Sequence, residues 1–421
     1  MGGGLMQLVA YGAQDIYLTG NPQITFFKVV YRRHTNFSME SIEQTFNGSA
    51  NWGKKVSCTI SRNGDLIHRV YLQTTLPAVD AGDDKTFAWS EWVGHQLVKN
   101  VEVEIGGQRI DKHYGEWMHL WNELSQSPGL QDGYARMVGH SAHLTVQTKE
   151  TAETTLYIPL QFWFCRNPGL ALPLIALQYH EVKINVEFNE LSKCSSSVPL
   201  GATSAGDLKN SSLYVDYIYL DTDERRRFAQ VSHEYLIEQL QFTGEESINS
   251  SSSKVKLNFN HPVKELVWVV QRNTASHFDF SDSSADTDGA TSGTPTDTDT
   301  PLDRQFDTLR VTRSLNTVKN AKLQLNGHDR FQEREGDYFN FVQPYQHHTN
   351  VPSTGINVYS FGLKPEEHQP SGTCNFSRID NAVLQLSMET EATAGSKVRV
   401  YATNYNVLRI MSGMGGLAYS N

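Results

Sequence analysis

Apolar and polar side chains alternate along much of the chain, which predicts half-buried β-strands. The clearest case is residues 98–110, where Val101, Val103 and Ile105 alternate with polar residues before a Gly-Gly pair. Gly-Gly and Asn-Gly pairs tolerate the positive φ that tight hairpin turns require. We therefore predict a strand that runs into a hairpin.

A version of this segment returns at residues 318–330, with an Asn-Gly pair in place of Gly-Gly, at a spacing of 318 − 98 = 220 residues. Neighbouring segments repeat in the same order at offsets of 199 and 200. The matching pairs are residues 55–60 with 254–259, 66–72 with 266–270, and 182–188 with 382–388. The repeat predicts two copies of one β domain. The acidic, turn-rich run 281–301 accounts for the longer spacing as a loop insertion in the second copy.

Length and composition agree with two soluble β domains. The 421 residues allow about 200 per domain, enough for each to bury its own core. Charged residues make up 19% and aromatic residues 10%, and glycine is frequent, which is typical of a turn-rich β protein. The net charge of −10 argues against nucleic acid as the principal partner. No apolar run is long enough to predict a membrane span.

Residues 1–23 are glycine-rich and then mixed, and we interpret them as an N-terminal arm. Strands are expected at residues 26–31 and 37–46. Residues 114–124 predict a short amphipathic helix, because four large apolar residues recur at helical spacing: Trp117, Leu120, Trp121 and Leu124. Tryptophans at this spacing favour core packing over a sugar-binding platform.

The first β domain is predicted to span residues 24–222 and the second residues 238–421, with a linker helix at 223–237. Asp221 is a candidate helix cap, and Glu224 lies three residues later, as in a capping box. The basic run 225–227 follows three acidic residues, which favours a solvated or interface face over a nucleic-acid patch.

These patterns predict an all-β protein of two tandem eight-stranded antiparallel jelly-roll barrels, with a few short helices in loops and at the junction. Capsid proteins, lectins and cupin enzymes all use jelly rolls, so the fold alone leaves function open.

Candidate catalytic and metal-binding residues are scarce. A cupin metal site needs a His-x-His pair, and the sequence has none. His140 and His143 are three apart and His347 and His348 are adjacent, so we interpret them as polar surface. The four cysteines are widely spaced, which favours reduced thiols and folding in the cytoplasm. We predict no catalytic residue, no cofactor and no metal.

Four long blocks, residues 14–27, 221–228, 365–380 and 404–413, strongly resemble the major capsid proteins of nucleocytoplasmic large DNA viruses. The resemblance is strongest to the phycodnavirus and iridovirus branches. It extends over nearly the whole chain and departs mainly in loops such as 192–212 and 281–301. Long blocks of this kind are far more specific than a short motif.

The resemblance implies a structural protein, not an enzyme, with a double jelly roll that forms a homotrimer of pseudo-hexagonal outline. Such capsomers tile the icosahedral outer shell of a virion around an internal membrane. Implied partners are neighbouring capsomers, minor capsid proteins and penton proteins, without direct contact to nucleic acid. The resemblance also implies assembly in the host cytoplasm, an inward-facing arm, and outward loops that include residues 281–301.

Site residues at this stage are hypotheses. Trimer interfaces are rich in aromatic side chains, and core packing explains the same residues equally well. The candidates are Trp163, Phe164, Tyr338, Phe339 and Phe341. Five N-glycosylation sequons occur, and we interpret most of them as chance matches, because host N-glycosylation does not reach a protein that assembles in the cytoplasm. If glycans are present, Asn210 and Asn249 in Ser-rich loops are the more accessible candidate acceptors. A carbohydrate-binding double β domain and a two-cupin metalloenzyme are the alternatives to a capsid protein.

Overall fold

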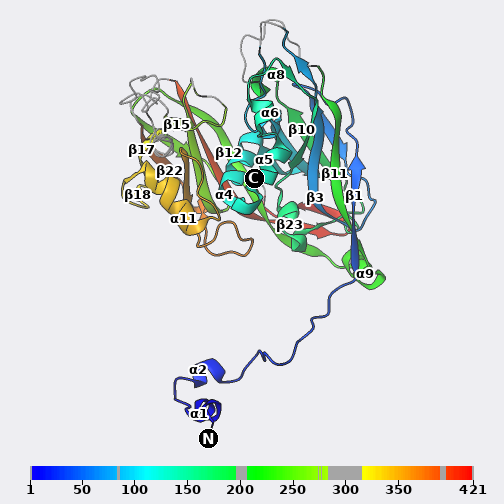
Figure 1. Ribbon diagram of the computed structural model, residues 1–421, viewed down its shortest axis with the longest axis vertical. Coiled ribbons are helices and arrows are strands. Elements are labelled where there is room, and N and C mark those ends of the chain that lie inside the picture. Colours follow the sequence, from blue (N-terminus) through cyan, green and yellow to red (C-terminus); the bar gives the residue numbers. More distant parts are fainter. Residues whose placement is uncertain are drawn as a thin grey trace. The chain divides into compact units, whose positions relative to one another are not determined.

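The computed structural model describes residues 2–82, 86–195, 206–273, 275, 277–282, 315–388 and 395–419. The chain forms two compact units, Met1–Phe37 and Ser38–Asn421. The first unit contains α1 (Gly3–Val9) and α2 (Ile16–Thr19) (Figure 1). The strand expected at residues 26–31 is absent, because these apolar side chains are exposed and pair with no other segment described. The arm therefore extends past residue 23 to Phe37.

The first half of the larger unit contains two antiparallel sheets. The outer sheet has the order β1 (Phe37–Gln44), β11 (Lys209–Leu220), β3 (Leu66–Leu76), β8 (Thr154–Pro159). The inner sheet has the order β2 (Lys55–Thr59), β10 (Val182–Phe188), β5 (Val98–Ile105), β6 (Gln108–Tyr114). Short strands add to these: β9 (Leu172–Pro173) on β3, and β4 (Val79–Asp80) paired with β7 (Glu150–Thr151).

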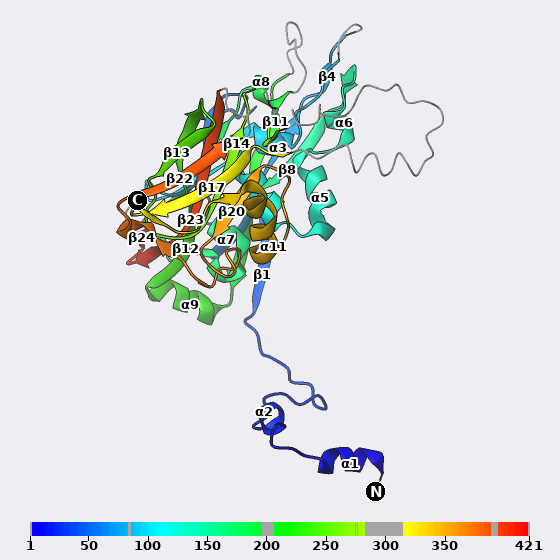
Figure 2. The same cartoon turned by 90° about the vertical axis from the view of Figure 1, so that its left-hand side faces the viewer.

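The second half repeats this arrangement (Figure 2). One sheet has the order β12 (His233–Ile248), β23 (Ser396–Met411), β14 (Pro262–Gln271), β20 (Ile356–Ser360). The other has the order β13 (Ser252–Leu257), β22 (Ala382–Met388), β17 (Val318–Leu325), β18 (His328–Asp329). The short strands are β21 (Cys374–Asn375) on β14, β24 (Met414–Leu417) on β23, β19 (Arg334–Glu335) on β17, and β15 (Ser281–Asp282) paired with β16 (Leu315–Asn316).

All repeated segments identified in the sequence occupy matching positions in the two halves. Strand β2 corresponds to β13, β3 to β14, β5 to β17 and β10 to β22 in the order of their sheets. The double jelly roll predicted from the repeat is therefore confirmed. Of the expected insertion 281–301, only Ser281 and Asp282 lie within the described residues.

The two hairpins that follow β5 and β17 have the predicted turn chemistry. Gly106 and Gly107 have φ values of 59° and 83°, and Asn326 and Gly327 have values of 50° and 82°. Ile105 pairs with Gln108, which leaves two residues in the turn. This is the backbone geometry for which glycine and asparagine are favoured.

Short helices cap and connect the strands. They are α3 (Val93–Leu97), α4 (Gly115–Ser125), α5 (Pro128–Val138), α6 (Ala142–Thr145), α7 (Trp163–Arg166), η1 (Pro168–Leu170), α8 (Leu191–Cys194), α9 (Thr222–Gln230), η3 (Tyr338–Val342), α11 (Gln343–His347) and η4 (Phe376–Arg378). Asp221 caps α9 as predicted, since its carboxylate accepts from the Thr222 amide at 2.7 Å. The helix ends at Gln230 and β12 begins at His233, before the expected residue 238.

Candidate functional site at the junction of the two barrels

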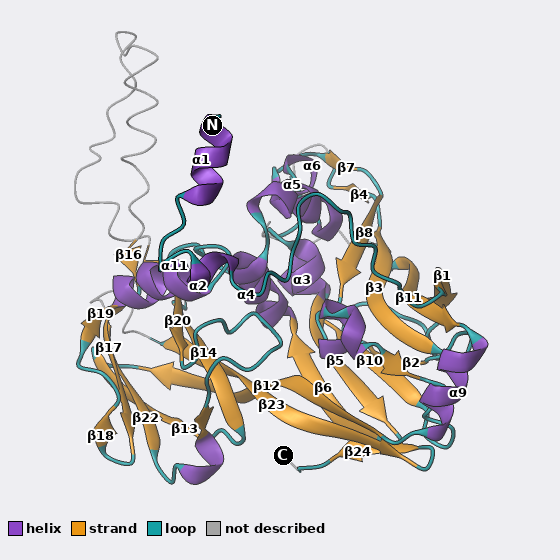
Figure 3. Cartoon of the chain, turned by 90° about the horizontal axis from the view of Figure 1, so that it is seen from below, coloured by secondary structure: helices purple, strands orange, loops and turns teal. Residues whose placement is uncertain are grey.

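Helix α4 lies between the two barrels (Figure 3). Its apolar face consists of Trp117, Leu120, Trp121 and Leu124, all buried. The residues that it packs against belong to the second barrel: Val267, Val269, Ile356, Val358 and Tyr401. Core packing of these tryptophans is thus confirmed. The core that they build joins one barrel to the other.

A polar clamp holds the first turn of α4 to strand β23. The Glu116 carboxylate lies 2.7 Å from the Arg399 guanidinium and accepts from the Tyr401 hydroxyl at 2.8 Å. Burial disfavours the charged form of Arg399, but Glu116 outweighs it and raises the Arg399 pKa. A charge-assisted pair with little solvent exposure keeps the helix in one orientation on the sheet.

A second polar group centres on Glu238 of β12. Its carboxylate lies 2.9 Å from Arg166, 3.0 Å from Lys264 and 3.3 Å from His368. Burial raises the pKa of Glu238, yet these donors outweigh burial and lower it to about 2. Arg166 comes from the first barrel, so one carboxylate ties both barrels and the loop that carries His368.

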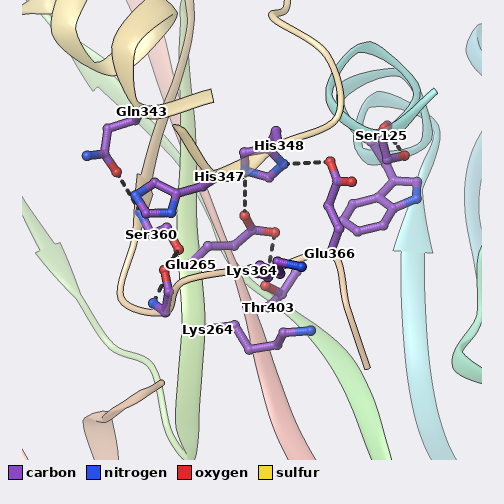
Figure 4. Close-up of polar contacts among 12 residues, drawn as sticks. Ser125, Lys264, Glu265, Gln343, His347, His348, Ser360, Lys364, Glu366 and Thr403 are labelled. Carbon is purple, nitrogen blue, oxygen red and sulfur yellow. Dashed lines mark hydrogen bonds and ion pairs between the residues drawn. The ribbon is translucent and has the colours of Figure 1, made fainter. Parts of the chain in front are cut away.

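His348 forms the third polar group (Figure 4). Its side chain is fully shielded from solvent, with Glu265 and Glu366 each at 2.9 Å. Burial alone would lower the pKa of His348, but the two carboxylates raise it to about 9. His348 is therefore an imidazolium at neutral pH, and the prediction that it is polar surface is wrong.

Strands β12 and β23 also extend past their own barrel. They pair from His233 opposite Ile410 to Ile248 opposite Ser396. Three of their side chains belong to the core of the first barrel: Ile237, Leu408 and Ile410. The Leu240 amide donates to Asp111 of β6 at 3.1 Å. One two-stranded ribbon thus contributes to both barrels and joins them.

An aromatic and histidine cluster lies beside α4. The Trp92 ring stacks on His140 at 4.5 Å and on His95 at 5.7 Å, and His119 stacks on Phe278 at 4.5 Å. The Nδ1 atoms of the three imidazoles are buried and make no hydrogen bond. Burial lowers the pKa of His119 to about 3 and lowers that of His95 as well. The imidazoles of His95 and His119 are therefore neutral at pH 7 in the folded protein.

A cleft of about 590 Å³ lies between the barrels, beside the first turn of α4. Charged side chains line it, and several of them neutralise one another. Lys397 pairs with Glu245 at 2.7 Å, and Arg399 pairs with Glu116. Within the described residues, no group of three or more His, Cys, Asp or Glu side chains is arranged to hold a metal ion. Ion pairs stabilise the cleft, and its lining residues connect the two barrels.

The candidate site residues are dispersed in the structure. Trp163, Phe164 and Phe339 are buried in the barrel cores, which matches the core alternative. Tyr338 is half-buried and Phe341 is 41% exposed. Asn210 and Asn249 are exposed. Only Tyr338 and Phe341 remain on a surface where they can contact another chain.

The junction itself was missed at the sequence level. Its polar centres, Glu238, Glu265 and His348, have partners from 18 to 130 residues away. Such distant pairs leave no periodic or local pattern. The available signal was the apolar stripe of α4 together with Val267 and Val269, which make β14 apolar on both faces.

None of the helices described in this chain has the length and apolar character needed to cross a membrane.

Comparison with known proteins assigns both halves of the chain. The family model described as large eukaryotic DNA virus major capsid protein matches residues 224–416. The model of the major capsid protein N-terminus matches residues 25–221. The division between the two matches falls at helix α9, between the two barrels.

Relatives match along their whole length. The major capsid protein of Pyramimonas orientalis virus is 61% identical, and that of Paramecium bursaria Chlorella virus 1 is 47% identical, with complete coverage of both chains in each case. A chain in the quasi-atomic model of the PBCV-1 virus capsid has a TM-score of 0.77 at 42% identity, covering 94% of this chain and all of that one. The Faustovirus major capsid protein, at 13% identity, shares the fold with a TM-score of 0.74, covering 95% and 94% of the two chains.

These matches bear on the three functional hypotheses. The family and the named relatives are structural capsid proteins, which excludes the two-cupin metalloenzyme. They also agree with the double jelly roll. This chain therefore belongs to the major capsid proteins of large eukaryotic DNA viruses.

Proposed function

We propose that three copies of this chain form a capsomer of pseudo-hexagonal outline, and that these capsomers tile the icosahedral outer shell of the virion. The observation that carries the proposal is the matching sheet order of the two barrels. Three chains with two like barrels each present six similar units around one axis. The shared ribbon and α4 hold the barrels in one mutual orientation, which a regular lattice needs.

The finer partners follow from the same proposal. Neighbouring capsomers, minor capsid proteins and penton proteins bind the barrels, and the N-terminal arm faces an internal viral membrane. Exposed apolar side chains in the arm support this, among them Phe26, Phe27 and Tyr31. Assembly takes place in the host cytoplasm. Asn210 and Asn249 are the proposed glycan acceptors, and their exposure supports that role.

Light scattering of the purified protein tests the capsomer. We expect one stable species near three times 47.4 kDa. Negative-stain images of that species should show particles with six-fold outline. A monomer over the micromolar range, without such particles, contradicts the proposal.

A further inference from the structure

The outer sheet of the first barrel carries an aromatic strip. Tyr71 of β3 stacks on Tyr214 of β11 at 5.2 Å with nearly parallel rings, and lies 6.3 Å from Tyr157 of β8. The three side chains come from adjacent strands and point away from the barrel core, since Leu72, Leu156 and Val215 fill it. Tyr157 is 40% exposed. A row of tyrosines with partly open faces is typical of a protein interface.

The second barrel shows what covers the corresponding sheet. There Val267 of β14 lies opposite Tyr401 of β23, as Tyr71 lies opposite Tyr214 in the first barrel. Helix α4 is seated on that pair, with the Trp117 ring 5.6 Å from the Tyr401 ring. Helix α4, which follows β6 of the first barrel, thus packs on the sheet of the second barrel that corresponds to the outer sheet of the first.

The counterpart of α4 in the second barrel is the η3–α11 segment, residues 338–347. Both segments follow the last strand of the hairpin sheet and precede the next long strand, β8 or β20. Phe339 anchors η3 in the core beside Trp268, with ring centroids 5.2 Å apart. The outward side chains are Phe341, Val342 and Tyr345, which are 41%, 40% and 79% exposed. Among the residues that the structure describes, none covers them as the second barrel covers α4.

The two open surfaces lie at opposite ends of the row of sheets. Figures 1 and 3 place α11 with the second barrel, and β1, β11 and β3 at the far side of the first barrel. If the outer sheet of one chain binds the helical segment of the next, the two chains are joined head to tail. Head-to-tail contacts close into a ring when the rotation per chain fits.

We propose that the Tyr71, Tyr157 and Tyr214 face binds a second copy of this chain, and that the element seated on it is that copy's η3–α11 segment. The contact repeats between chains what α4 does within the chain. This inference rests on the proposed trimer and names its interface. Two different surfaces meet at each junction, and three junctions close the capsomer.

The first test replaces either surface in the full chain. Tyr71→Glu with Tyr214→Glu removes the sheet surface, and Phe341→Glu with Tyr345→Glu removes the helical surface. Each double variant should shift the mass from three times 47.4 kDa to 47.4 kDa. Tyr179→Glu is the matched control, because Tyr179 is an exposed tyrosine outside both surfaces, and it should stay trimeric.

The second test mixes the two double variants. Each chain then retains one good surface, so a head-to-tail contact forms one junction and stops. We expect a 1:1 dimer near twice 47.4 kDa, and no closed trimer. An interface in which like surfaces meet would instead let either double variant form a dimer by itself, before mixing.

The outcomes separate the inference from the proposed function. If the unmodified chain stays monomeric, the proposed trimeric capsomer is wrong. Unmodified and variant chains that are all trimeric leave the capsomer intact and overturn the interface. Circular dichroism checks the fold of each variant, and if a double variant unfolds, the single changes Tyr157→Glu and Tyr345→Glu decide, since both side chains are exposed.

Discussion

The imidazole of His119 packs between Trp92 and Phe278 and is neutral, because burial lowers its pKa to about 3. The pKa of an unfolded-state histidine is about 6.5. A group whose pKa falls on folding stabilises the folded state above the unfolded pKa, and that contribution is lost as the pH drops below it. Acid therefore weakens the fold at this residue, starting near pH 6.5.

We predict that His119→Phe flattens the pH dependence of unfolding. Phenylalanine preserves the ring contacts and does not titrate. Between pH 7 and pH 5, protonation of His119 in the unfolded state should cost the unmodified chain about 2 kcal/mol of unfolding free energy, and the variant should not lose this amount. Denaturant unfolding at fixed protein concentration from pH 7 to 4 measures it. His143→Phe, at an exposed position, is the control, and parallel curves for all three proteins would contradict the prediction.

Glu238 gives the second prediction at this scale. Glu238→Ala leaves Lys264 buried without its carboxylate, which costs about 3–5 kcal/mol of unfolding free energy. The double variant Glu238→Leu with Lys264→Met should be less destabilised than the single one, because no buried ammonium remains unpaired. Since the pKa of Glu238 falls to about 2, its contribution is present above about pH 4.5 and is lost below it. A double variant destabilised as much as Glu238→Ala, or more, would contradict this coupling.

Individual residues were harder to predict than strands. His348 follows a histidine in a loop, and its local sequence resembles polar surface. Its two carboxylate partners, Glu265 and Glu366, are brought to it by β14 and by a loop after β20. Only the folded chain joins these positions. Trp163 and Phe164 are a similar case, because their aromatic character alone does not show whether they lie in the core or at an interface.

At the scale of elements, the sequence correctly predicted those strands and turns that follow from a local pattern of residues. Alternation of period two identified the strands at 98–105 and 318–325, and their turn residues placed the hairpins. The failures have one physical cause, which is dependence on a partner. Residues 26–31 are rich in aromatic and β-branched side chains, as strands are, but pair with no described strand. The extension of β12 to His233 depends on pairing with Ile410.

Helix α4 is the element on which the junction depends, and Trp117 is its most buried large side chain at that surface. We predict that Trp117→Ala lowers the free energy of unfolding by about 3–5 kcal/mol, through lost burial and a residual cavity. Because the cavity weakens the contact between the barrels, we expect the variant to unfold in two transitions and the unmodified chain in one. Calorimetry with tryptophan fluorescence measures both effects.

The matched control for Trp117 is Leu130→Ala, a truncation on the exposed face of α5. Surface changes of that kind stay within about 0.5 kcal/mol. A Trp117→Ala protein that still unfolds in one transition, with equal stability, would show that the ribbon alone couples the barrels.

At the scale of the whole molecule, charge is distributed unevenly. The chain carries −10 overall, yet the N-terminal unit has Lys28, Arg32 and Arg33 against the single acid Asp15. Its side chains are otherwise largely apolar and exposed. Basic and apolar residues together favour an anionic lipid surface, to which each cation near the membrane contributes about 1 kcal/mol. The acidic body is repelled by the same surface, so membrane contact should depend on the arm.

Deleting residues 2–36 should leave the unfolding transition and the trimer mass unchanged, because the arm contributes no buried residue. The same deletion should abolish flotation with vesicles that contain phosphatidylserine. A full-length variant with Lys28, Arg32 and Arg33 changed to Gln retains the apolar residues and should bind about a hundredfold more weakly, as three lost cations at about 1 kcal/mol each imply. Neutral vesicles are the lipid control. If the full chain binds both vesicle types equally, or if the deletion variant still floats, the arm is not the membrane contact and its apolar side chains belong against another protein.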